Sequence, residues 1–175
     1  MIRTQRLWLR RAEPGDLMAL HAIFTDPRAM RYWARPAHDN LDQSRAYLDR
    51  MMNPQPGTAD DYVIELKGKV IGKAGAWRLP EVGFILHPDH WGKGYAHEAL
   101  WAVIQHLFAT HPIDPIVAEA DPRNAASLGL LSRLGFIETH RAEKTLLWGD
   151  EWCDSVYLAL TRNVWARVQN PQISR

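Results

Sequence analysis

The 175-residue chain has a single cysteine, no long apolar run and no excess of charge of one sign. One cysteine, Cys153, excludes an internal disulfide framework and fits a reducing compartment. We therefore expect a cytoplasmic protein in which Cys153 is a small buried or half-buried side chain. No stretch approaches the roughly 18 apolar residues of a membrane span, and the N-terminal segment lacks the apolar core of a secretion signal.

The charges of the chain nearly cancel, with 21 Lys and Arg against 20 Asp and Glu and a formal net charge of +1. Such a balance gives no strong field for nucleic acid or an anionic membrane surface, so we expect neither as a partner. The histidines give no metal pattern. His87 and His90 lie around Pro88 rather than on one helix face, and His106 and His111 are expected at the surface. No metal site is predicted.

The apolar content of the chain, 46%, is sufficient for one packed core. We find no internal repeat, low-complexity tract or linker. The sequence therefore predicts a single domain over residues 1–175, with residues 169–175 as a loose tail, present as a monomer or a homodimer.

Hydrophobic periodicity predicts strands that first form a meander and then alternate with helices. Strands are expected at 7–9, 62–66, 70–77, 82–86, 116–120, 136–141 and 155–160, and helices at 16–24, 40–52, 95–108 and 125–134. Asp26-Pro27 should end the first helix and Gly135 the last. This order indicates a mixed α/β (α+β) fold, with helices on both faces of a mixed sheet.

Residues 91–97, W-G-K-G-Y-A-H, place two glycines at the start of the helix expected from Tyr95. Backbone N–H groups at a helix start have no internal partner, the helix dipole adds positive potential, and glycine lets a ligand approach the backbone. The pattern favours a phosphate site, a pyrophosphate in particular. The alternative is a plain tight turn with glycines for positive φ. A Walker loop is absent, and His97 stands where a dinucleotide fingerprint needs its third glycine.

Three stretches together resemble the GNAT acyltransferases. The run E-V-G-F-I-L-H-P-D-H-W-G-K-G-Y-A-H-E-A-L (81–100) is similar to their acetyl-CoA motif, usually written Q/R-x-x-G-x-G/A. D-P-R-N-A-A-S-L-G-L-L-S-R-L-G-F (121–136) resembles their N-x-x-S/A…G-F segment. R-L-W-L-R-R-A-E-P-G-D (6–16) is similar to the opening of the RimJ/RimL-like subgroup of ribosomal-protein N-acetyltransferases. The resemblance covers about residues 2–160 and implies a mostly antiparallel sheet with a splay between two strands.

Three positions depart from the family pattern. Trp91 stands where Gln or Arg is usual, although Trp is familiar in the RimJ/RimL-like subgroup, and His97 stands where Thr or Ser is common. Leu131 occupies the place where many relatives carry a tyrosine that protonates the leaving thiolate. The last departure puts the usual general acid in doubt.

The resemblance implies a binding site for acetyl-CoA. Backbone groups of Phe84, Ile85 and Leu86 would hold the pantetheine arm as a pseudo-strand, and one N–H would stabilise the oxyanion. Asn124 would bond the same arm or, alternatively, cap the helix that follows. Lys93 would add a charge contact or remain a solvated loop lysine. The pyrophosphate would lie on the backbone of Gly92, Lys93, Gly94, Tyr95, Ala96 and His97.

Acetyl transfer to an amine needs a general base, because an amine of pKa about 10 is mostly protonated at neutral pH. Glu119 is the first candidate, since some relatives carry a catalytic Glu five residues before the Asn, and Glu81 is the second. Either is alternatively a surface carboxylate at a strand end. Ser127 is the candidate proton donor to the thiolate, or else a helix serine bonded to backbone.

Trp33 and Trp77 would wall the acceptor cleft, with ordinary core packing as the alternative. The hypothesis is an N-acetyltransferase that moves an acetyl group from acetyl-CoA to a primary amine by direct attack in a ternary complex. The amine would belong to a protein N-terminus, a lysine or a small molecule. The alternative function is a non-catalytic acyl-CoA-binding or sensing domain on the same fold.

Overall fold

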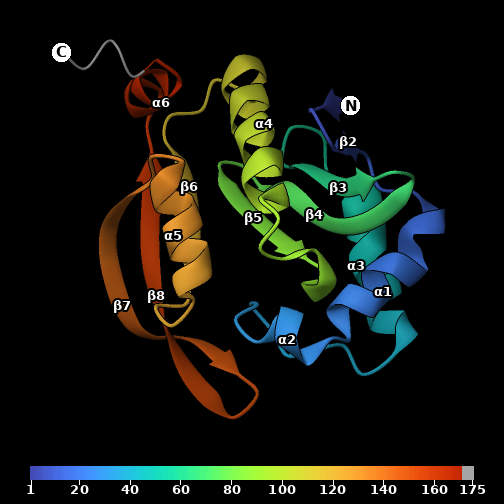
Figure 1. Cartoon of the computed structure of the whole chain (residues 1–175). Helices are drawn as coiled ribbons and strands as arrows, with labels where there is room; N and C mark the ends of the chain where they lie inside the picture. Colours follow the sequence, from blue (N-terminus) through green and yellow to red (C-terminus); the bar gives the residue numbers. More distant parts are fainter. Residues whose placement is uncertain (171–175) are drawn as a thin grey trace.

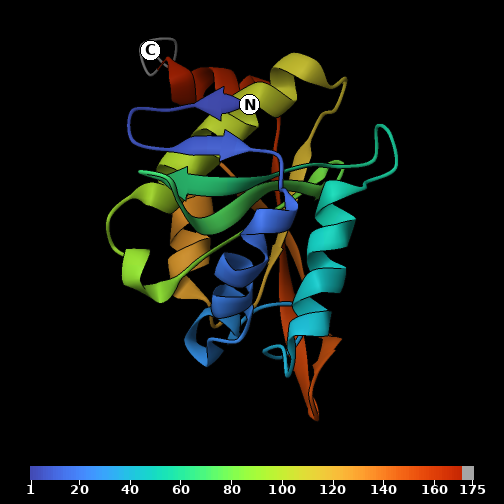
Figure 2. The same ribbon diagram turned by 90° about the vertical axis from the view of Figure 1, so that its right-hand side faces the viewer.

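The computed structural model describes residues 1–170 and contains an eight-stranded sheet in the order β1-β2-β3-β4-β5-β6-β8-β7. Helices lie on both faces of this sheet (Figures 1 and 2). The strands are β1 Ile2–Arg3, β2 Trp8–Arg10, β3 Asp60–Leu66, β4 Lys69–Arg78, β5 Glu81–Leu86, β6 Ile116–Ala120, β7 Ile137–Trp148 and β8 Glu151–Leu160. The α-helices are α1 Leu17–Phe24, α2 Pro27–Met30, α3 Leu41–Met52, α4 Tyr95–Thr110, α5 Ala125–Arg133 and α6 Arg162–Gln169.

Two hydrophobic clusters hold the layers together. The larger cluster packs α4, α5 and α6 on one face of the sheet, with Ile104 and Leu131 among its buried members. The smaller cluster packs α1 and α3 on the other face, around Phe24 and Leu48. Because successive strand residues point to opposite faces, one strand can contribute to both clusters. The predicted fold class is thereby confirmed.

The pairing of β5 with β6 differs from every other pairing in the sheet. These two strands are parallel, and the register between them consists of the single pair Glu81↔Val117. The other neighbouring strands described in residues 1–170 are antiparallel. The two strands therefore join at their N-terminal ends and part toward their C-terminal ends, which is the splay that the family resemblance implies.

Three predicted elements need correction. Asp26-Pro27 does end α1, but Asp26 also caps the short helix α2, in which Pro27 is the first residue. Strands β7 and β8 extend to a turn at residues 149–150, well beyond the predicted 136–141 and 155–160. Most of β7 is exposed, so its sequence lacks the apolar alternation that would reveal it.

The C-terminal helix α6 was not predicted at all. Thr161 caps it, and Trp165 buries its ring at 4.6 Å from Trp101 of α4. Gln169, expected in a loose tail, is the last residue of this helix, and the rest of the expected tail from residue 171 lies outside the described residues. No helix in residues 1–170 is long and apolar enough to cross a membrane.

His106 and His111 were expected at the surface, but the structure half-buries both against Asp60. Their Nε2 atoms lie 3.0 and 2.9 Å from the Asp60 carboxylate, which is 3% exposed. Arg11 pairs with the same carboxylate at 2.6 Å, and the Tyr62 hydroxyl donates to it. Burial raises the pKa of Asp60, but these donors outweigh burial and hold it below its ordinary value.

Asp60→Asn is therefore expected to weaken the dependence of stability on acid. The stabilisation that a carboxylate with a lowered pKa supplies is present above its unfolded pKa of about 3.9 and disappears as pH falls through the folded pKa. Urea unfolding at pH 5 and pH 3 should show that the advantage of the wild type over Asp60→Asn shrinks in acid. A constant difference between the two pH values would contradict this assignment. Asp42→Asn, at an exposed position, is the control.

Candidate active site

The gap between β5 and β6 leaves backbone groups of β5 without a neighbouring strand. Phe84, Ile85 and Leu86 pair on one side with Ala74, Lys73 and Gly72 of β4. On the other side, no register pair joins residues 82–86 to β6 in the described part of the chain. Open N–H and C=O groups along an extended strand can bind an extended ligand as an added strand.

The glycine turn lies between β5 and α4. Gly92 and Gly94 have φ of +70° and +79°, and Gly94 is the N-cap of the 16-residue helix α4. Positive φ alone accounts for both glycines as a tight turn. The turn also leaves the helix start open, since a glycine cap brings no side chain, and a Cβ built on Gly92 would meet nothing within 4 Å. An anion can therefore reach the first N–H groups of α4.

Arg6, which no local sequence pattern marks, supports this turn from the loop between β1 and β2. Its guanidinium donates to the Lys93 carbonyl at 2.9 Å and to the Glu98 carboxylate at 2.6 Å. It also stacks over the Tyr95 ring at 4.6 Å. The positive charge of Arg6 thereby balances the negative charge of Glu98. Arg6, Gly94, His97, Glu98 and Arg133 line a hollow of about 670 Å³ beside the turn, which is therefore basic.

Two other residues of the turn are bonded within the loop itself. Trp91, the departure from the usual Gln or Arg, donates its indole N–H to the Leu86 carbonyl at 2.9 Å and so fixes the end of β5. Lys93 donates its ammonium group to the Asp89 carbonyl at 2.7 Å. A ligand would have to draw Lys93 out of this contact to use its charge.

The start of α5 shows why one amide can serve two purposes. The Asn124 side-chain oxygen accepts the Ser127 N–H at 3.1 Å, so Asn124 is the N-cap of α5. The amide NH₂ group remains for a ligand. Leu131 is 1% exposed within the larger cluster, while Ser127, one turn earlier on the same side of α5, is only half-buried. Ser127 is the better placed of the two to meet a ligand.

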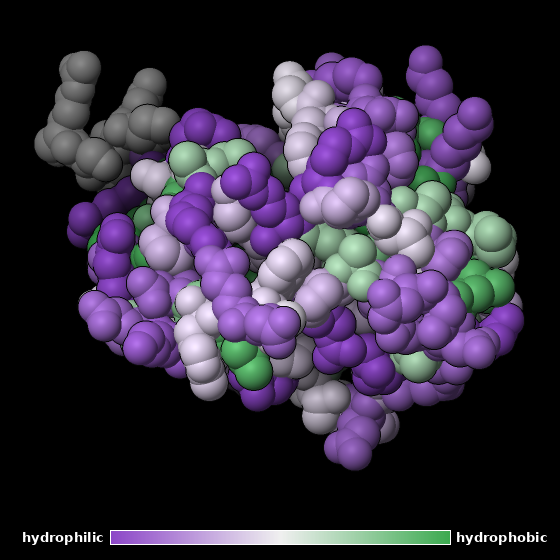
Figure 3. Space-filling model, turned by 90° about the horizontal axis from the view of Figure 1, so that it is seen from below, coloured by the Kyte–Doolittle hydropathy of each residue, from purple (hydrophilic) through white to green (hydrophobic). Residues whose placement is uncertain are grey.

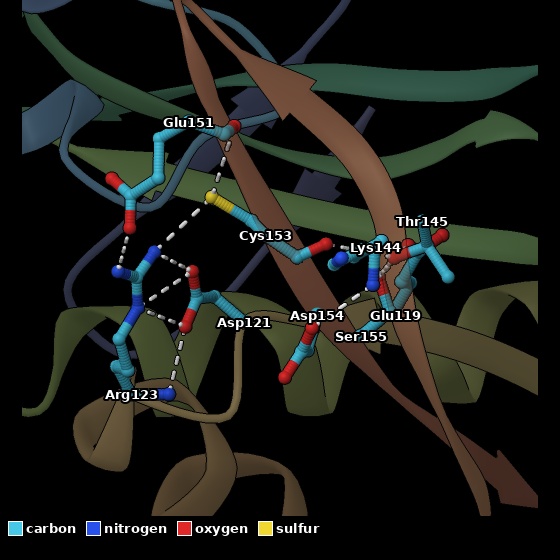
Figure 4. Close-up of polar contacts among 9 residues, drawn as sticks. All are labelled: Glu119, Asp121, Arg123, Lys144, Thr145, Glu151, Cys153, Asp154 and Ser155. Atoms are coloured by element: carbon cyan, nitrogen blue, oxygen red, sulfur yellow. Dashed lines mark hydrogen bonds and ion pairs between the residues drawn. The ribbon is translucent and has the colours of Figure 1, made fainter.

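Both candidate bases project from the face of the sheet that α1 and α3 cover. Ile116, Ala118 and Ala120 of β6 pack into the larger cluster, so Glu119 points to the opposite face, and the same alternation applies to Glu81. Glu119 accepts the Ser155 hydroxyl, and Ser155 contacts Thr145 at 2.6 Å (Figure 4). Glu81 pairs with Arg78 at 3.0 Å. Two carboxylates thus lie on one face, with Glu81 at the joined end of the gap and Glu119 two residues beyond Val117 on β6.

An ion-pair cluster borders the other end of the gap, after β6. Arg123 bridges Asp121 and Glu151, each at 2.7 Å, and approaches the buried Cys153 sulfur at 3.2 Å (Figure 4). Burial raises the pKa of Asp121, but Arg123 outweighs it and the pKa is lowered. The guanidinium also lies 5.9 Å from the Tyr32 ring, which brings the segment after α2 close to the loop after β6. Cys153 is buried, as predicted.

A pocket of about 370 Å³ opens between α3 and β4. Trp77, 48% exposed, forms one wall and Tyr47 of α3 another, with Asp61, Arg50 and Arg78 among the polar lining. Trp77 therefore lines a pocket, and its place in an acceptor cleft stays a prediction. Trp33 does not line this pocket but packs against the smaller cluster, which is its core-packing alternative.

Lys73 of β4 lies beneath this pocket and is fully buried. Its ammonium group pairs with Asp61 at 2.6 Å and contacts the Tyr47 hydroxyl at 3.3 Å, with the Trp33 ring at 5.8 Å. Burial lowers the pKa of Lys73, but the charge of Asp61 and the contact with Tyr47 raise it by more than burial lowers it. The pKa of Lys73 is therefore above its ordinary value, and the side chain stays protonated. No sequence pattern marks this residue, because a lysine in a strand is typical of the solvent side.

Comparison with known proteins identifies the class to which this fold and site belong. Residues 6–137 match the acetyltransferase (GNAT) domain family, and the chain therefore belongs to that family of acetyltransferases. It is 32% identical over 143 residues to the uncharacterized N-acetyltransferase p20 of Bacillus licheniformis, covering 76% of this chain and 80% of that one.

Two further relatives have names that state an acceptor. The chain is 36% identical over 91 residues to the [ribosomal protein uS5]-alanine N-acetyltransferase of Escherichia coli, covering 52% of this chain and 47% of that one. The crystal structure of spermidine N-acetyltransferase from Vibrio cholerae in complex with CoA and spermine superimposes with a TM-score of 0.80. That match is 19% identical and covers 93% of this chain and 99% of that one, so it shows the shared fold.

Proposed function

We propose that this acetyltransferase moves the acetyl group of acetyl-CoA to a primary amine by direct attack in a ternary complex. The observation that carries the proposal is the gap between β5 and β6. One end of it leads to the glycine turn and the start of α4, and the face beyond it holds Glu81 and Glu119. A donor bound through the gap would reach from an anion site on one face to two carboxylates on the other.

Acetyl-CoA would lie along β5, with its pantetheine arm on the open backbone of residues 84–86 and on the Asn124 amide. Its pyrophosphate would sit on the N–H groups of residues 92–97, which the α4 dipole favours. The solved relative from Vibrio cholerae was crystallised with CoA, which supports this ligand. The lone buried cysteine supports a cytoplasmic setting.

Glu119 would accept a proton from the incoming amine, directly or through water, and Glu81 is the second candidate. Glu119 is exposed and fixed by Ser155, so it is both solvent-accessible and oriented. The free amine then attacks the thioester carbon, an N–H of β5 stabilises the oxyanion, and the C–S bond breaks. The nitrogen of the intermediate gives up its remaining excess proton, the leaving thiolate gains a proton through the Ser127 hydroxyl, and CoA departs as the free thiol.

Two observations support an amine as the acceptor. The names of the relatives specify an alanine of a ribosomal protein in one case and spermidine in the other. The face that carries α2 and the tip of the β7–β8 hairpin is largely hydrophilic, with apolar residues in small separate patches (Figure 3). Such a surface suits a polar acceptor. A non-catalytic acyl-CoA-binding domain has only the buried Leu131 in its favour.

Gly94→Val tests the donor site. Acetyl-CoA at about 100-fold over its Kd should add roughly 2.7 kcal/mol to the stability of the wild type, and NAD should add nothing. The valine side chain would crowd the helix start, since a Cβ at Gly94 already lies 3.3 Å from Arg6, and we expect at least a 100-fold loss of affinity. Thermal unfolding with and without acetyl-CoA measures both.

Gly68→Val is the matched control for backbone strain. Gly68 also has a φ of +79°, and a Cβ there meets nothing within 4 Å, far from the turn in the β3–β4 hairpin. This variant should lose stability but keep its response to acetyl-CoA. Unchanged acetyl-CoA affinity in Gly94→Val would refute the site. Release of free thiol with an amine panel then separates transfer from binding alone.

A further inference from the structure

The charges around the 370 Å³ pocket between α3 and β4 are unequal. Its charged lining residues are Asp61, Arg50 and Arg78. Asp61 is the only carboxylate among them in the described part of the chain, and Lys73 neutralises it from below at 2.6 Å. Since Lys73 is fully buried and held in place by Tyr47 as well, Asp61 is not free to bind a cation.

The two arginines of the pocket, Arg50 and Arg78, each stack on one of its aromatic rings. Arg78 stacks over Trp77 at 4.8 Å and pairs with Glu81, so its charge is balanced. Arg50 stacks over Tyr47 at 5.4 Å, and no carboxylate among residues 1–170 forms an ion pair with it. With the other two charges of the lining matched, the pocket carries one uncompensated positive charge, at Arg50.

Trp77 and Arg78 lie between the pocket and the face of the sheet that carries Glu81 and Glu119. The Trp77 ring lies 3.6 Å from where a Cβ on Gly83 of β5 would stand, so the ring lies beside the donor strand. Arg78 touches both the pocket and the Glu81 carboxylate. A molecule in the pocket therefore lies next to one candidate base, on the face that also carries Glu119.

We infer that the acceptor is an amine whose other end carries a carboxylate, bound by Arg50 between the Tyr47 and Trp77 rings. This inference rests on the proposed acetyl transfer and names its substrate class. A guanidinium presents paired N–H donors that match a carboxylate. A polyamine brings a second positive charge, which would lie near the positive charge of Arg50. The carboxylate that could balance that second charge, Asp61, is already paired with Lys73.

Matched acceptors at constant length test this inference. Acetyl-CoA turnover is followed by thiol release with ω-amino carboxylates, n-alkylamines and α,ω-diamines of three to six carbons. A second series uses C-terminally amidated tetrapeptides with N-terminal alanine and Glu, Gln or Lys at position 2, 3 or 4, so that the side chain supplies the only carboxylate. The best carboxylate should exceed the diamine or Lys peptide of equal length by at least about 10-fold in kcat/KM. The two series distinguish a small acceptor from a peptide.

Arg50→Gln should bring the carboxylate and neutral acceptors to within about 2-fold of each other, through KM rather than kcat. Arg45→Gln is the control, since Arg45 lies on the same helix and pairs with the exposed Asp42 at 2.8 Å. It should leave the preference intact. Both variants should keep the thermal shift with acetyl-CoA, which shows that the donor site is undisturbed.

A preference for diamines, equal rates across the charges, or a carboxylate preference that survives Arg50→Gln would overturn the inference. So would a protein that is stabilised by acetyl-CoA but accepts no member of either series. Loss of the acetyl-CoA shift in the wild type is a different result, because it would refute the proposed function itself.

Discussion

Glu119→Gln is expected to lower acetyl transfer at neutral pH by about 10²- to 10⁴-fold, the usual contribution of a general base. The substitution keeps the shape of the side chain and an oxygen that can accept the Ser155 hydroxyl, so the fold and the donor site should be preserved. The deficit should shrink as pH rises toward the pKa of the amine, about 10, because free amine then needs no base. A profile of kcat/KM from pH 6 to 10 measures it.

Glu143→Gln is the control, since Glu143 is an exposed carboxylate on β7. It should leave the profile unchanged. A deficit in Glu119→Gln that is the same at every pH would remove the base role from Glu119. Glu81→Gln in the same assay would then show whether the role passes to Glu81 or to water.

Lys73→Met is expected to lower the free energy of unfolding by about 3–5 kcal/mol, because it leaves the Asp61 carboxylate buried without its counter-ion. The Lys73–Asp61 pair is the most enclosed ion pair in the described structure, with side chains 1% and 7% exposed. Urea unfolding at neutral pH measures the change. Lys69→Met, at an exposed position of the same strand, should stay within about 0.5 kcal/mol of the wild type.

A double variant distinguishes loss of a charge partner from loss of packing. Lys73→Met combined with Asp61→Leu removes both charges and keeps apolar volume, so it should recover most of the stability. If the double variant is as unstable as the sum of the two single variants, the ion pair is not the cause. The interaction energy from this cycle measures the pair itself.

The sequence predicts those parts of the fold in which burial follows a regular period. Helix α4 is an example, since its apolar residues recur at helical spacing and all pack into one cluster. Strand β7 is the opposite case. Its residues face water on most of its length, so it is held by pairing to β8 rather than by burial, and pairing leaves no pattern in a single sequence.

The candidate site divides in the same way. The glycine turn and Asn124 could be found because backbone requirements and helix capping restrict the residue type. Arg6 and Lys73 could not, since each acquires its significance from a partner outside its own element. Arg50 could not either, because its role depends on a pocket that α3 forms with β4. Arg6 contacts a carbonyl 87 residues away, and the residues next to it in the sequence do not indicate this contact.

The single register pair between β5 and β6 also decides how the cleft could widen. On the α4 side, one cluster continues from β4 across to β6 and β8, so the two halves of the sheet are packed there as one body. On the α1 side, the smaller cluster ends at Ile85 of β5, and its described members include no residue of β6 or β8. If the two halves of the sheet separate, they should therefore rotate about an axis on the α4 side. The donor's phosphates would lie near that axis and stay bound, while the acceptor side would undergo the largest displacement.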